Sequence, residues 1–171
     1  MIHAGALRRT PLACAAAAAT GATAVLDAHS VVPIATATAL AGWGGLVVAL
    51  FVRAALPVAR TVATVIIPGL LAVAYVLLFT RGGDGLHGGF DALAQLRALL
   101  ADDAALAAAW LHYLAFDLFV GAWIVHESDQ FELPPWLIVP CLGLTCVAGP
   151  AGLLAFIAVR TVVPRLVTSV R

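Results

Sequence analysis

The sequence predicts an all-α integral membrane protein with four transmembrane helices and an interfacial amphipathic helix between the second and the third. The first observation is composition: 63% of the 171 residues are apolar, 11% are charged, and the mean hydropathy is +1.06. Soluble domains carry about 25% charged residues, so lipid must cover part of this apolar surface. The second observation is a series of apolar runs of roughly 20 residues, the length that spans a bilayer as a helix.

The charge and cysteine content excludes several function classes. The formal net charge at pH 7 is zero, and no basic tract occurs, so we expect no nucleic-acid partner. The three cysteines, Cys14, Cys141 and Cys146, lack the spacing of a zinc site, and we expect neither a metal nor a cofactor. Every basic residue is arginine and alanine is abundant, which is typical of a GC-rich genome and favours a bacterial source.

Composition divides the chain into three parts. Residues 1–28 form an N-terminal extension, in which a basic start precedes a weakly apolar run of about 15 residues, too short to span a bilayer. Cleavage, disorder and a fifth helix all stay open for this part. Residues 29–160 are predicted to form a single four-helix membrane domain, and residues 161–171 a cytoplasmic tail.

The predicted spans are long apolar runs separated by turns or charged segments. Small residues around Trp43 permit close helix packing in the first span, and Pro68 predicts a kink in the second. The sequence GPAG at 149–152 must bend or thin the fourth span. The four spans cover residues 31–52, 61–79, 105–125 and 136–159.

The connection between the second and third spans contains leucines at helical spacing among charged residues, over residues 90–109. This pattern predicts an amphipathic helix at the membrane surface, and two roles stay open for it, a solvated connector or a lid. With four spans, seven of the nine arginines lie on the side of the two termini and the long loop. The positive-inside rule therefore predicts cytoplasmic termini in a bacterial inner (plasma) membrane, or a plastid membrane if the source is a photosynthetic eukaryote.

Ionisable side chains interrupt the third span. An aspartate at the centre of a membrane helix costs roughly 2.5–3.5 kcal/mol to insert, so Asp117 is expected to be functional or paired. At 100° per residue, Asp117 lies about 140° around the helix from His112, on a neighbouring flank. His126 and Glu127, at the end of the span, are expected to mark the interface.

Three roles stay open for Asp117. Away from water a carboxyl group favours its neutral form, in which it can donate a proton as a general acid. It can instead pair with His112 or with a backbone group freed by a proline, or line a proton or ion path. For His112, an interfacial position in an aromatic belt with Trp110 and Tyr113 and a catalytic role both stay open.

The run WLHYLAFDLFVGAWIVHES, residues 110–128, resembles the signature of the ABA4-like family of small membrane proteins. The run GPAGLL at 149–154 is similar to a second motif of this family, and the resemblance covers residues 39–160. Ala122 stands where the family pattern has arginine. The plant members are implicated in converting violaxanthin to neoxanthin, an isomerisation of a carotenoid epoxide to an allene.

The resemblance implies a membrane protein that acts on a carotenoid or another isoprenoid lipid taken from the bilayer, with His112 and Asp117 as the acid and base. A non-enzymatic scaffold that binds a pigment or a protein partner is the alternative, and the oligomeric state stays open. The residues expected to support the site are Trp110, Tyr113, Gly121, Trp123, Glu127, Gly149 and Pro150.

Overall fold

The computed structural model describes residues 27–81 and 87–169, and every element in these ranges is a helix, as the sequence predicts. The predicted N-terminal extension lies almost entirely outside the described residues. The elements are α2 (Ala28–Phe51), η1 (Arg53–Ala55), α3 (Leu56–Thr61), η2 (Val62–Ile66), α4 (Ile67–Arg81), α5 (Leu93–Leu99), α6 (Asp103–Gln130), α7 (Pro135–Val147) and α8 (Gly149–Ser169).

Three helices in the described ranges are long and apolar enough to cross a membrane: Ala28–Phe51, Arg53–Thr80 and Asp103–Gln130. They agree with the first three predicted spans. The second is continuous but contains the π-helical turn η2 just before Pro68. Because proline lacks an N–H group and its ring crowds the carbonyl four residues earlier, the backbone widens locally.

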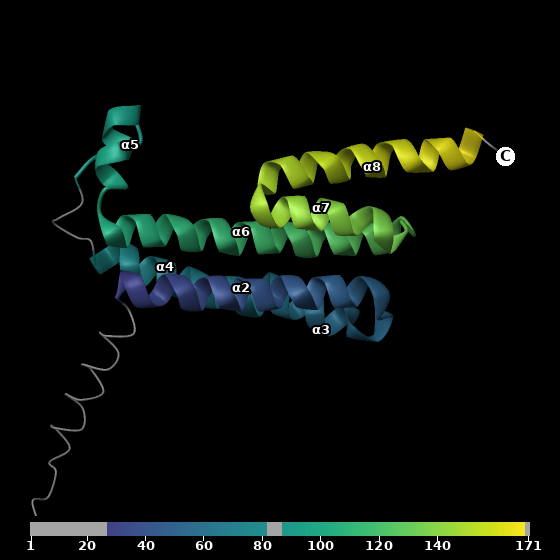
Figure 1. Cartoon of the computed structure of the whole chain (residues 1–171), viewed down its shortest axis with the longest axis horizontal. Coiled ribbons are helices and arrows are strands. Elements are labelled where there is room, and N and C mark those ends of the chain that lie inside the picture. Colours follow the sequence, from purple (N-terminus) through teal and green to yellow (C-terminus); the bar gives the residue numbers. More distant parts are fainter. Residues whose placement is uncertain (1–26, 82–86, 170–171) are drawn as a thin grey trace, which may run out of the picture.

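The fourth predicted span is not one helix. The chain leaves helical geometry at Ala148, where φ is −147° and ψ is 70°, and then reverses direction. The helices α7 and α8 consequently pack against each other as a hairpin, which ends near the middle of α6 (Figure 1). The GPAG sequence therefore separates two helices instead of bending one.

The reversal brings α8 back along α6 toward the end at which α6 finishes. Arg53 forms an ion pair with Asp129 and Arg160 forms one with Glu127, each at 2.7 Å, so both arginines lie at the C-terminal end of α6. The first residues of α2 lie at the opposite end (Figure 1). The start of α2 and Arg160 of α8 therefore lie at opposite ends of α6. The prediction that both termini share one side of the membrane concerns chain ends that lie outside the described residues, and it stays a prediction. The segment predicted as a tail continues α8 as far as Ser169.

The amphipathic helix is shorter than the predicted range 90–109. Helix α5 has seven residues, and α6 already begins at Asp103, where the side chain of Asp102 caps it by accepting from the Ala105 N–H at 2.9 Å. In Figure 1, α5 stands to one side of the bundle at the end where α6 begins, and of its residues Leu99 is buried.

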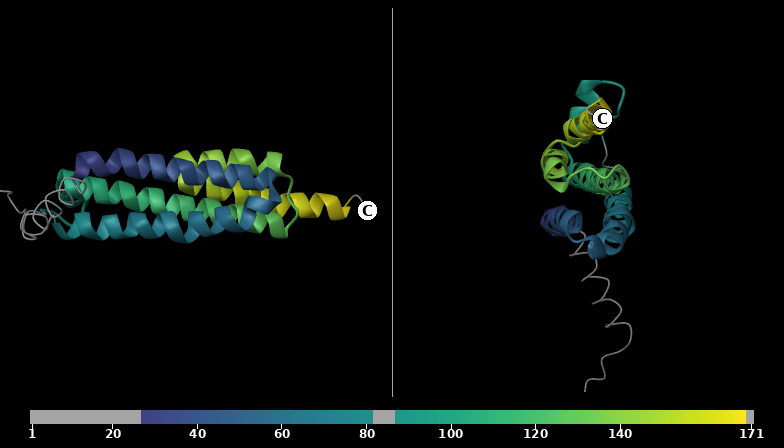
Figure 2. Two further views of the ribbon diagram at one scale, coloured as in Figure 1. Left: turned by 90° about the horizontal axis from the view of Figure 1, so that it is seen from below. Right: turned by 90° about the vertical axis from the view of Figure 1, so that its right-hand side faces the viewer.

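Helix α6 is the centre of the bundle, because it contacts α2, α4, α7 and α8 (Figure 2). Small residues let its neighbours approach. Of the three glycines around Trp43, Gly42 lies at a close contact, where an added β-carbon would stand 2.9 Å from the side chains of Ile67 and Leu118. Gly44 and Gly45 have no such neighbour within 4 Å.

Gly121 receives the indole of Trp43, and its substitution tests this contact. An added β-carbon would lie 2.5 Å from Trp43 Cη2 and 3.4 Å from Leu46 Cδ1. We expect Gly121→Ala to lower the free energy of unfolding by about 1–3 kcal/mol, the usual cost of overpacking. Thermal unfolding of the purified protein would measure it, with Gly45→Ala as the matched control. Equal midpoints for the two variants would show that Trp43 can move at no cost.

Candidate functional site

Asp117 lies near the middle of the 28-residue α6, about 21 Å from either end. At this depth it faces the turn between α7 and α8. A β-carbon at Gly149, the first residue of α8, would collide with the Asp117 carboxyl group. The carboxyl group therefore packs directly on the backbone of Gly149.

This position suits a carboxyl group because the first turn of a helix carries N–H groups without intrahelical partners and a partial positive charge. Ala151 and Gly152 donate to the carbonyl of Ala148 and so close the first turn. Pro150 follows Gly149 near the start of α8, where a missing N–H costs nothing and the fixed φ fits the helix. The Asp117 carboxyl group thus places oxygen atoms that can accept hydrogen bonds at the start of α8.

Tyr113 lies one helical turn before Asp117 and contacts the other side of the break, which is the end of α7. Its hydroxyl donates to the carbonyl of Val147 at 2.9 Å and to that of Cys146 at 3.3 Å. These carbonyls belong to the last turn of α7, which has no intrahelical donors for them. Broken helices are tolerated inside a membrane where protein groups satisfy the backbone, and α6 provides such groups through Tyr113 and Asp117.

A cavity of about 310 Å³ opens beside this break, between α2, α6 and the end of α7. Within the part of the chain that the structure describes, the Asp117 Oδ2 atom is buried and has no hydrogen-bond partner. A buried polar atom without a partner is uncommon and requires an explanation, such as a bound proton, water or ligand. The cavity is lined by Thr36, Ala39, Leu40, Trp43, Trp110, Tyr113, Leu114, Asp117, Cys146 and Val147.

His112 projects elsewhere. Its ring stacks on Phe116, with centroids 4.4 Å apart, and lies 6.0 Å from the ring of Tyr75. It lines a separate cavity of about 280 Å³ between α4, α5 and α6. The two predicted catalytic residues therefore lie in different cavities. The aromatic neighbours of His112 are Phe116 and Tyr75, whereas the predicted belt partners Trp110 and Tyr113 stack on each other.

The other predicted residues lie along α6 or form the turn between α7 and α8. Trp110 stacks on Tyr113, and its indole N–H donates to the Thr36 hydroxyl at 3.0 Å. Trp123 meets Phe156 of α8 edge to face, with centroids 5.6 Å apart. Glu127 is paired with Arg160, whose guanidinium also lies over the Phe131 ring at 4.7 Å. Gly121 and Glu127 thus hold neighbouring helices, and Gly149 and Pro150 form the turn.

Sequence reasoning missed the cavity residues contributed by α2 and α7. Thr36 and Cys146 carry no local motif, and they join the site because α2 and the end of α7 pack on the same side of α6. The one sequence signal that could have identified the α2 residues of the cavity is their spacing. Thr36, Leu40 and Trp43 are separated by three or four residues and so lie on one face of a helix.

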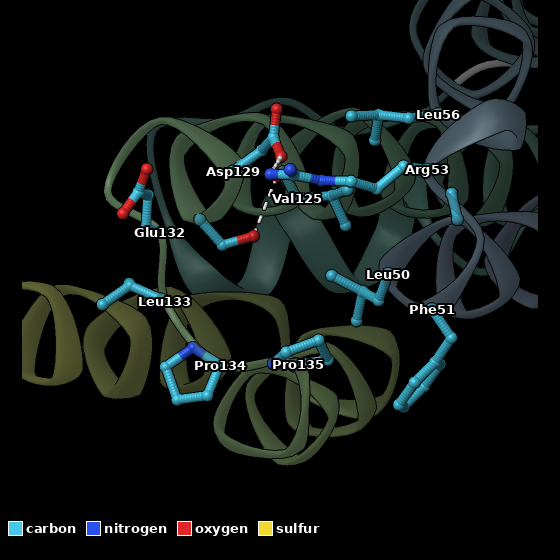
Figure 3. Close-up of a pocket in the computed structure, with 12 residues that line it drawn as sticks. Leu50, Phe51, Arg53, Leu56, Val125, Asp129, Glu132, Leu133, Pro134 and Pro135 are labelled. Atoms are coloured by element: carbon cyan, nitrogen blue, oxygen red, sulfur yellow. Dashed lines mark hydrogen bonds and ion pairs between the residues drawn. The ribbon is translucent and has the colours of Figure 1, made fainter.

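A second polar region lies at the C-terminal end of α6, about 18 Å from Asp117 along the helix axis. There a cavity of about 460 Å³ is lined by Arg53, Asp129 and Glu132 together with the two prolines at the start of α7 (Figure 3). The Arg53–Asp129 ion pair crosses its mouth and is largely exposed, and such pairs contribute about 0–1 kcal/mol. We interpret this region as the closure of one end of the bundle.

Among the described residues, no group of three or more histidine, cysteine or acidic side chains is placed to hold a metal ion.

A family model described as ABA DEFICIENT 4-like, or ABA4-like, matches residues 31–156, which is more than half of the chain. The match includes all residues that line the Asp117 cavity and the turn that packs on it. The comparisons with curated proteins and with solved structures found no match.

Proposed function

Because the chain belongs to the ABA4-like family, we propose that it binds a carotenoid or a related isoprenoid from the bilayer and isomerises it by proton transfer at Asp117. The observation that carries the proposal is the Asp117 Oδ2 atom, which is buried, unpartnered within the described structure, and part of the lining of an apolar cavity. The apolar lining suits a hydrocarbon, and the single free oxygen suits one polar group on it.

The proposed chemistry needs no other reactant. To isomerise an epoxide, a proton is placed on its oxygen while a carbon–oxygen bond breaks, and a proton is removed from a neighbouring carbon. The product is an alcohol with a new double bond, and neither protons nor electrons change in number. A neutral Asp117 can donate the first proton and, as a carboxylate, accept the second, so one carboxyl group serves as both acid and base.

The surroundings of Asp117 support this role. Tyr113 is committed to the carbonyls of Cys146 and Val147 and fixes the break that Asp117 faces. Trp43 and Trp110 contribute aromatic surface to the lining, which suits a polyene. Because the cavity lies near the middle of a membrane-length helix, a ligand can enter it laterally from lipid.

His112 stays a proposed second acid or base. The cavity that His112 lines is on the other side of α6 from a ligand bound beside Asp117. We therefore assign the essential proton transfer to Asp117. The variant His112→Gln would measure what His112 adds.

We further propose three membrane crossings, with the α7–α8 hairpin entering from one side and α5 at the membrane surface. The apolar lengths of the three long helices and the shorter lengths of Pro135–Val147 and Gly149–Val162 support this arrangement. The membrane is proposed to be a bacterial inner membrane, or a plastid membrane in a photosynthetic eukaryote.

The second candidate is a binding protein without catalysis. It is favoured by the packing of Asp117 on Gly149, which gives the carboxyl group an architectural task that needs no substrate. A pigment or lipid could then occupy the cavity without reacting.

Loss of the gene tests the proposed function. In a strain from which it is deleted, liquid chromatography and mass spectrometry of extracted pigments and isoprenoids should show one compound accumulating. An isomer of identical mass should disappear, because isomerisation conserves atoms. Expression of the wild-type chain should restore the isomer. An unchanged profile of pigments and isoprenoid lipids would contradict the proposal.

A further inference from the structure

Two cavities lie in a row along α2 and α6, from the N-terminal ends of these helices to Asp117, and together they are called the groove here. These two helices start at the same end, where the His29 Nε2 atom lies 3.7 Å from Asp103 Oδ2, and they run side by side in the same direction (Figure 1). A cavity of about 420 Å³ occupies this end. It is lined by Ala28, His29, Val32, Pro33, Asp103, Leu106, Ala107 and Trp110.

The two cavities are consecutive parts of one groove. The α2 residues of the outer cavity and those of the Asp117 cavity follow one another at helical spacing, and the same is true on α6. Trp110 lines both. Its hydrogen bond to Thr36 crosses the groove from α6 to α2, so one side chain separates the two parts.

Polar groups stand at both ends of this groove. At the outer end, His29 and Asp103 have side chains that are 81% and 73% exposed, so both can bind a further group. At the inner end is the unpartnered Asp117 Oδ2 atom. Between them the lining is mostly apolar, and Thr36, Trp110 and Tyr113 use their polar atoms in bonds within the protein. From Asp103 to Asp117 along α6 is about 21 Å.

We propose that the groove holds a single elongated lipophilic molecule that carries a polar group at each end, about 20 Å apart along the helix axis. The inner polar group binds Asp117, and the outer one binds His29 and Asp103 at the membrane surface. The inference rests on the proposed function and extends it, because His29 and Asp103 become a second subsite that selects ligands by length. The Trp110 side chain changes its rotamer so that the hydrocarbon part of the ligand can pass.

Binding of all-trans-retinol, a fluorescent polyene with one polar end, tests the groove. With the full chain in lipid nanodiscs, retinol in the Asp117 cavity should take up excitation energy from Trp43 and Trp110. Unlabelled competitors then displace it: hexadecane with a hydroxyl at both ends, hexadecanol, and a ten-carbon diol. We expect the long diol to displace retinol at about tenfold lower concentration than hexadecanol, and the short diol to have no such advantage.

Paired variants locate the outer subsite. In the double variant His29→Ala, Asp103→Asn, the advantage of the long diol should vanish, while displacement by hexadecanol stays unchanged. The control is His87→Ala, Asp91→Asn, which removes the same residue types at exposed positions outside the groove. Equal displacement by the long diol and hexadecanol in the wild-type chain, or a preference that survives the first double variant, would overturn the second subsite alone. Absence of energy transfer to retinol in the wild type would contradict the proposed binding function itself.

Discussion

Replacing Gly149 with alanine is expected to prevent the α7–α8 hairpin from closing on α6. The added β-carbon would collide with the Asp117 carboxyl group, and neither side can yield easily. Gly149 belongs to a turn whose backbone is fixed by bonds to the carbonyl of Ala148, and Asp117 lies in the middle of the central helix. We expect the free energy of unfolding to fall by about 3 kcal/mol or more, enough to remove much of the folded protein from the membrane.

The amount of folded protein after detergent extraction and its thermal midpoint would measure this effect. Gly143→Ala, in α7, is the matched control, because an added β-carbon there meets nothing within 4 Å. The double variant Asp117→Ala, Gly149→Ala should recover part of the lost stability, since the colliding group is then absent and the two effects are not additive. A single variant as stable as Gly143→Ala would show that the hairpin does not pack on Asp117.

Replacing Asp117 with asparagine is expected to remove the activity while leaving the protein folded. Asparagine has nearly the same shape and suits a helix start as well as aspartate does, but it cannot donate and recover a proton. Loss of an acid or base typically lowers a rate by about 10²–10⁴-fold, whereas we expect the thermal midpoint to change little. The measurement is the yield of the isomer in the deletion strain that expresses the variant, normalised to the amount of protein in the membrane.

Glu132→Gln is the matched control for this experiment, because it makes the same chemical change at an exposed acid near the C-terminal end of α6. It should restore the isomer fully. If Asp117→Asn also restores it fully, the carboxyl group does not transfer a proton. Its role is then the architectural one beside Gly149, and the chain is a binding protein.

The three long helices and the importance of Asp117 could be predicted from local sequence. Apolar runs of spanning length identify the helices regardless of their neighbours. A carboxyl group in the middle of such a run is costly enough to stand out. The end of the amphipathic segment was predicted less well, because Asp102 starts α6 through a cap that hydropathy does not reveal.

The reversal at Ala148 could not be predicted, because a bent span and a hairpin have the same hydropathy. Tyr113 and Asp117 meet the break from α6, more than 30 residues earlier in the sequence. For the same reason the angle of about 140° between His112 and Asp117 did not decide whether they share a cavity. Whether they share a cavity depends on which helices pack against each side of α6. Here α4 and α5 lie on the side of His112, and α2 and α7 lie on the side of Asp117.

The hairpin also has a consequence for how the chain is inserted during synthesis. In the proposed arrangement α7 begins at the end of α6 to which α8 returns, so Arg160 of α8 would need no translocation once α6 is in place. With the three proposed crossings, the start of α2 and Arg160 of α8 would face different compartments. In this proposed arrangement, Asp117 meets a helix start near the middle of the bundle without a fourth crossing, and the segment that completes the site is also the one that can insert last.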